Sequence, residues 1–63
     1  MMSRFQHLYQ SAWAIKISLK QDFETETDPA IKDEIAKMTV SNDLTIARII
    51  EGGKVAGQPI KQN

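Results

Sequence analysis

The stretch Asp22-Phe23-Glu24-Thr25-Glu26-Thr27-Asp28-Pro29 divides the chain into two helical patterns. Its acidic side chains lie at the carboxyl end of the first pattern, where the helix dipole disfavours negative charge, so the first helix is expected to end near Phe23. Asp28 then suits a helix N-cap, and Pro29 suits the first position of a helix. Two helices joined by this short connection predict an antiparallel helical hairpin.

The first helix is expected over residues 3–23. Ser3 followed by Gln6 is typical of a capping box, in which each side chain bonds the backbone N–H of the other residue. Apolar residues then recur at spacings of three and four, as on one face of a helix; they are Phe5, Leu8, Ala12, Ile15 and Leu19. Tyr9 and Trp13 widen this face beyond what one partner helix can cover, which predicts a second contact surface.

The second helix is expected over residues 28–51, with an apolar stripe of its own. That stripe consists of Ile31, Ile35, Met38, Ile46 and Ile49. Val40 and Leu44 fall on the opposite side of the helix. Two alternatives remain open: these two residues contact a second chain, or the helix is kinked or broken near 39–42 and restarts with a new phase.

The chain is expected to hold one all-α domain over residues 1–52. Gly52 suits the left-handed position after a helix, and residues 53–63 are expected to form a flexible tail. A chain of 63 residues buries only about 60% of its unfolded surface and has no cysteine for a disulfide. The missing burial predicts dimerisation into a helical bundle.

The charge pattern bears on the class of partner. Eight basic and eight acidic side chains give a net charge of zero, whereas a nucleic-acid binder usually has a basic excess. No apolar run approaches the roughly 20 residues of a membrane span, and no signal peptide begins the chain, so a cytoplasmic location is expected. His7 is the only histidine and has no acidic neighbour, so no catalytic, metal or cofactor site is expected.

Residues 34–50 resemble the helix-turn-helix of the lac-repressor type. Ala36 and the run Thr45-Ile46-Ala47-Arg48-Ile49 stand at the spacing of that family, although Val40 replaces its turn glycine. The resemblance implies that Thr45 and Arg48 contact DNA. The two residues that would then bind phosphates are Lys37 and Lys54.

Asn42 lies near the middle of the second apolar stripe. It either pairs with its twin in a dimer, which fixes the register of the two chains, or caps a restarted helix. The sequence leaves both alternatives open.

The aromatic residues indicate where two chains meet. Phe5, Tyr9 and Trp13 fall within nine residues, and Trp and Tyr are favoured at protein interfaces. The predicted contact residues between chains are Phe5, Tyr9, Trp13, Val40, Asn42 and Leu44.

In size, cap placement and apolar seam, the chain resembles the small dimeric helical-hairpin accessory proteins of temperate phages and plasmids. That resemblance implies a non-enzymatic regulatory or accessory protein, a homodimer that acts through contacts with another protein. The alternative function is a helix-turn-helix DNA-binding transcriptional regulator.

Overall fold

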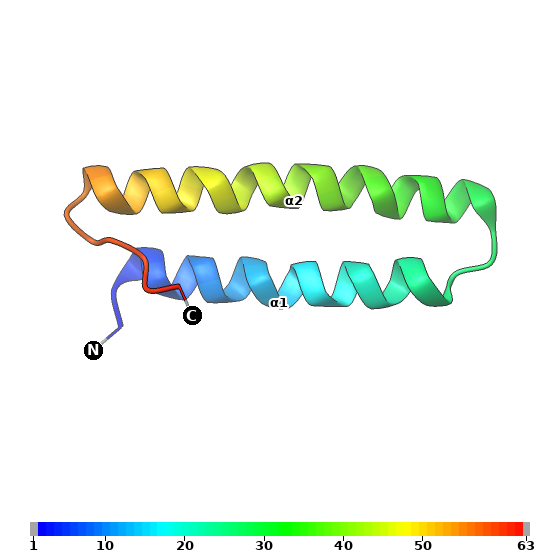
Figure 1. Cartoon of the computed structure of the whole chain (residues 1–63), viewed down its shortest axis with the longest axis horizontal. Helices are drawn as coiled ribbons and strands as arrows, with labels where there is room; N and C mark the ends of the chain where they lie inside the picture. Colours follow the sequence, from blue (N-terminus) through cyan, green and yellow to red (C-terminus); the bar gives the residue numbers. More distant parts are fainter. Residues whose placement is uncertain (1, 63) are drawn as a thin grey trace.

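The computed structural model describes residues 2–62 and shows two antiparallel α-helices that lie side by side (Figure 1). Helix α1 spans Arg4–Thr25 and helix α2 spans Pro29–Val55. The described residues contain no strand. The predicted all-α hairpin is therefore confirmed, with both helices somewhat longer than expected.

Both predicted helix starts carry side-chain caps. Ser3 Oγ accepts a hydrogen bond from the N–H of Gln6 at 3.1 Å, and Asp28 Oδ1 accepts one from the N–H of Ala30 at 2.9 Å. The capping box is only half formed, because the side chain of Gln6 bonds the backbone of Lys61 instead of the backbone of Ser3. In the connection, Glu26 Oε1 accepts hydrogen bonds from the next two backbone N–H groups, each at 3.0 Å.

Helix α2 runs without interruption through residues 39–42, so the alternative of a broken helix is wrong. Two hydroxyl groups in and just after this segment bond back within the helix: Thr39 Oγ1 donates to the carbonyl of Ile35, and Thr45 Oγ1 donates to that of Ser41. Back-bonding of this kind often bends a helix slightly, but it does not interrupt α2. Val40 consequently stays helical and projects into solvent, with 71% of its surface exposed.

The end of α2 differs from the expectation for Gly52. The helix continues to Val55, and the residue with a left-handed backbone is Gly57, at φ 72°. The chain after the helix satisfies carbonyls of the last turns, because Gln58 N donates to the oxygen of Gly53 at 2.7 Å. The segment predicted as a tail thus begins in helix and then lies back against the first turns of α1 (Figure 1).

The core between the two helices is thin. Its buried apolar side chains are Ala12, Ile35 and Ile46. Near the open end of the hairpin the ring of Phe5 lies against Gly52, where an added Cβ would come within 2.9 Å of Phe5 Cε1. A two-helix layer has no further element to cover it, so most apolar side chains of the described chain remain at the surface.

Candidate interaction surfaces

The hairpin presents two different flanks, one on each side of the line along which the helices touch. Ile15 and Lys16 are consecutive residues on α1, about 100° apart, that straddle this line beside the buried Ala12. They therefore point to opposite flanks. The flank on which Lys16 lies carries charged side chains. The flank on which Ile15 lies is uncharged over most of its length.

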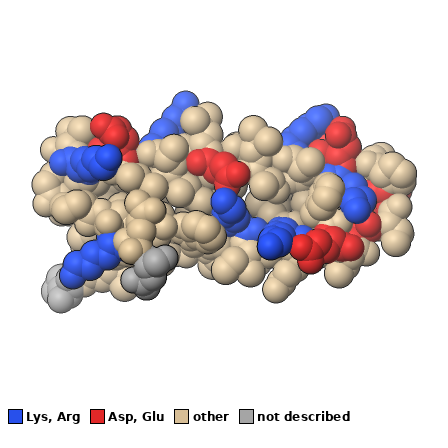
Figure 2. Space-filling model, viewed as in Figure 1, with Lys and Arg blue, Asp and Glu red and all other residues tan. Residues whose placement is uncertain are grey.

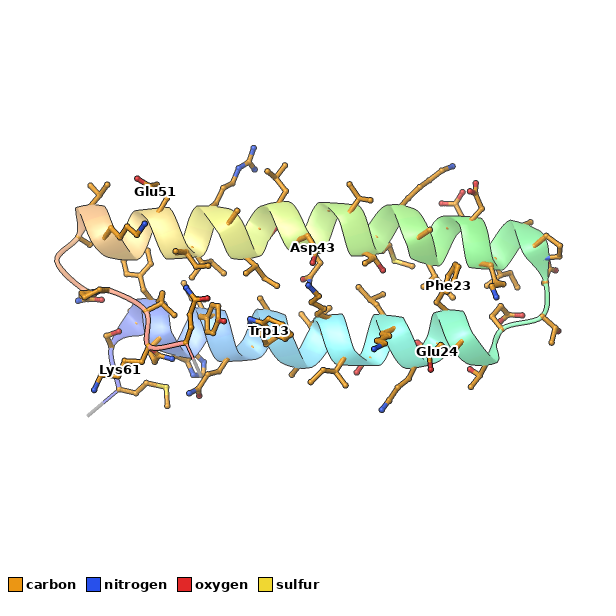
Figure 3. The ribbon with its side chains drawn as sticks, in the orientation of Figure 1. Trp13, Phe23, Glu24, Asp43, Glu51 and Lys61 are labelled. Atoms are coloured by element: carbon orange, nitrogen blue, oxygen red, sulfur yellow. The ribbon has the colours of Figure 1, made fainter. Side chains whose placement is uncertain are left out.

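The charged flank is built from seven residues of both helices: Tyr9, Trp13, Lys16, Lys20, Phe23, Lys32 and Asp43. Lys16 Nζ lies 3.1 Å from Asp43 Oδ1 and 4.8 Å from the centre of the Trp13 ring. The Tyr9 and Trp13 rings meet edge to face, with their centres 6.2 Å apart. Figure 3 shows Trp13 and Asp43 on the viewer's side of the hairpin, and Figure 2 shows basic and acidic groups gathered there.

The aromatic rings of this flank are covered in part by ammonium groups. Besides Lys16 over Trp13, Lys32 Nζ lies 4.4 Å from the centre of the Phe23 ring. At an exposed site, a cation over a ring face is weakly attracted to it. This flank also holds an open, mainly apolar hollow between the helices, lined by Lys16, Lys20, Phe23, Ala36 and Thr39, so it combines charge with accessible apolar surface.

The apolar flank carries an open hollow between the helices with no charged side chain in its lining. The lining residues are Ile15, Leu19, Met38, Ser41, Asn42 and Thr45. Leu8 and Ile31 extend it, because each lies seven residues before a lining residue of its own helix. Four large side chains of this flank are exposed: Leu8, Ile15, Ile31 and Met38. We call these eight residues the apolar flank.

The six predicted contact residues do not form one surface. Tyr9 and Trp13 belong to the charged flank, and Phe5 is half-buried against Gly52. Val40 and Leu44 are exposed on the side of α2 that faces away from α1. Of the six, only Asn42 lies on the apolar flank. The prediction missed most of this flank because its large apolar residues were assigned to the seams between the two helices.

Asn42 has a role within the hairpin. Its side-chain Nδ2 donates a hydrogen bond to the backbone carbonyl of Ala12 on α1, at 3.1 Å. It lies in the interior of α2, so the predicted helix cap is wrong. Pairing of Asn42 with its twin stays a prediction.

The residues of the DNA-binding alternative lie on one helix. Residues 34–50 are all helical, so the structure does not form the turn that separates the two helices of a helix-turn-helix. Lys37 lies 3.4 Å and 3.2 Å from the carboxylates of Asp33 and Glu34, and Lys54 lies 4.0 Å from that of Glu51. Both predicted phosphate contacts therefore have acidic neighbours.

The predicted DNA-reading residues are solvent-exposed. Thr45 and Arg48 both lie at the surface of α2, and Thr45 belongs to the apolar flank. DNA contact by either residue stays a prediction.

Within residues 2–62, no three His, Asp or Glu side chains are grouped to hold a metal ion, and neither helix has the length and apolar character of a membrane span. Comparisons of the chain with protein-family models, with curated proteins and with solved structures found no match. The two flanks of the hairpin are the candidate functional surfaces of the described residues.

Proposed function

We propose that this protein is a non-enzymatic regulatory or accessory module that works as a homodimer through protein–protein contacts. The observation that carries the proposal is the balance of apolar side chains. Eleven large apolar side chains are exposed in the described chain, whereas only three apolar side chains are buried. Four of them, Leu8, Ile15, Ile31 and Met38, lie together on the apolar flank, and a contiguous apolar patch of this kind marks a site of association.

The accessible surface area of the hairpin supports a second copy of the chain as the partner that covers the exposed apolar face. The accessible surface is 4844 Å², whereas a compact monomer of this mass exposes about 4,100 Å². The difference is close to the roughly 800 Å² that each partner buries in a stable interface. A face 43 Å long and 18 Å wide offers enough area for such an interface.

A dimer formed on one flank leaves the other flank free for a different protein. The charged flank offers Trp13 and Tyr9, residue types that dominate the binding energy of many interfaces. The resemblance in format to dimeric hairpin accessory proteins of phages and plasmids fits a regulatory role for this free surface. No contact of the structure favours the DNA-binding alternative over this proposal.

Sedimentation equilibrium of the full chain tests the proposal. We expect a mass of twice 7.1 kDa, and a thermal unfolding midpoint that rises with protein concentration over about a hundredfold range. A helical monomer whose unfolding midpoint does not change with concentration contradicts the dimer.

A further inference from the structure

A regular seam runs along α1 on the side of the apolar flank. Its residues follow one another at alternating spacings of four and three, the repeat of a coiled-coil seam. They are Arg4, Leu8, Ser11, Ile15, Ser18 and Asp22. The end residues Arg4 and Asp22 are 18 residues apart, which is five full turns and about 27 Å, so they lie on one side of the helix.

The seam matches its own reversed copy. When a second α1 lies antiparallel across it with the midpoints aligned, Arg4 faces the partner's Asp22 and Leu8 faces the partner's Ser18. Ser11 then faces the partner's Ile15. Each large side chain meets a small one, so the two helices can approach closely and interdigitate.

We infer that the second copy lies antiparallel on the apolar flank, α1 against α1, with the Arg4–Asp22 pairs closing both ends. This arrangement rests on the proposed homodimer and specifies its surface. Arg4 and Asp22 are exposed and form no ion pair among the described residues, so both are available to the partner. A parallel arrangement would place each of these charges beside its own twin.

Helix α2 places an uncharged residue, Thr45, close to the same symmetry axis. Lys16 contacts Asp43, Ala12 contacts Asn42 and Phe5 lies against Gly52, so the midpoint of the α1 seam is level with residues 41–46 of α2. Thr45 is exposed and lines the hollow of the apolar flank. In the antiparallel dimer Thr45 therefore faces its own twin, and no charged side chain is brought to the axis.

Two isoleucines provide a matched test of the surface. Ile15 lies on the apolar flank and Ile17 does not, yet both belong to α1 and both are 52% exposed. Ile15→Asp buries an unpaired charge in the inferred interface and is expected to weaken dimerisation at least about a hundredfold. Ile17→Asp is expected to change it by less than about threefold. Equal effects, or the reverse order, overturn the choice of flank.

Charge reversal tests the orientation of the two copies. Arg4→Glu and Asp22→Lys each replace two attractive pairs with two repulsive ones, so each is expected to weaken dimerisation about tenfold at low salt. The double variant restores opposite charges and is expected to return to within about threefold of the original affinity. Both single changes suit the helix dipole, so loss of helix does not explain a weaker dimer.

Cysteine cross-linking separates the antiparallel from the parallel arrangement, because the chain has no cysteine of its own. Thr45→Cys is expected to form a disulfide with its twin under mild oxidation. Ser18→Cys is not, because its twin lies about 15 Å away along the helix axis. Cross-linking of both variants indicates a parallel dimer.

The outcomes distinguish failure of the homodimer from failure of its inferred arrangement. A monomeric parent chain removes the proposed function and the arrangement together. A stable dimer in which the charge reversals have no effect, or the double variant does not recover, overturns the arrangement and leaves the homodimer standing.

Discussion

Two adjacent glycines near the end of α2 test how the chain after the helix is held. Gly52 and Gly53 are both helical, so replacing either with alanine favours the helix by about 1 kcal/mol. Their surroundings differ. A Cβ on Gly53 would lie 2.6 Å from the backbone oxygen of Gln58, whereas a Cβ on Gly52 would lie 2.9 Å from the ring of Phe5.

The two clashes differ in how they are relieved. The Phe5 ring is half-buried and turns about its side-chain bonds, so Gly52→Ala is expected to leave the free energy of unfolding within about 0.5 kcal/mol of its original value. Gly53→Ala pushes a backbone atom and displaces residues 58–62. This removes the hydrogen bond from Gln58 N to the oxygen of Gly53, which is 2.7 Å long, and both bonds between Gln6 and Lys61.

The expected cost of Gly53→Ala follows from these losses. Three hydrogen bonds of about 1 kcal/mol each, offset by about 1 kcal/mol of helix propensity, give a net loss of about 2 kcal/mol. Urea denaturation followed by circular dichroism measures this difference, with Gly52→Ala as the control at the same protein concentration. Amide hydrogen exchange reports the cause, because Lys61 N should lose its protection. A Gly53→Ala variant as stable as Gly52→Ala, with Lys61 still protected, refutes the reasoning.

Two further contacts between the helices give predictions of their own. Asn42→Asp replaces the donor to the carbonyl of Ala12 with a carboxylate, so it is expected to lower the free energy of unfolding by about 2 kcal/mol. Asn42→Ala is expected to lower it by about 1 kcal/mol, and urea denaturation measures both. Equal losses would indicate that the hydrogen bond does not form. A double-mutant cycle on Lys16 and Asp43 is expected to give a coupling of about 0.5 kcal/mol, because both groups are partly exposed. This coupling should fall as salt is added, and an effect independent of salt would contradict an ion pair.

Local signals predicted the helix starts correctly. Asp28-Pro29 fixes the start of α2 because the aspartate side chain bonds a free backbone N–H and proline fits the first helical position. Ser3 acts in the same way at the start of α1. Such caps involve residues within one turn of each other, so the sequence alone contains all the information they need.

The features that the sequence did not predict depend on residues distant in the chain. Gly52 was expected to end α2, but Phe5 from the other helix fits against it and the helix continues. Gln6 was expected to complete a capping box, but Lys61 occupies its side chain instead. No spacing rule along the chain relates Gln6 to a residue 55 positions later.

The structure changes the interpretation of Val40 and Leu44, which fall outside the apolar stripe of α2. Their departure from the apolar stripe suggested either a second chain or a broken helix, and the helix is unbroken. Both lie away from the α1 seam, so an antiparallel copy on the apolar flank leaves them uncovered together with Trp13. A symmetric dimer would carry this uncovered set twice, at positions related by the two-fold axis.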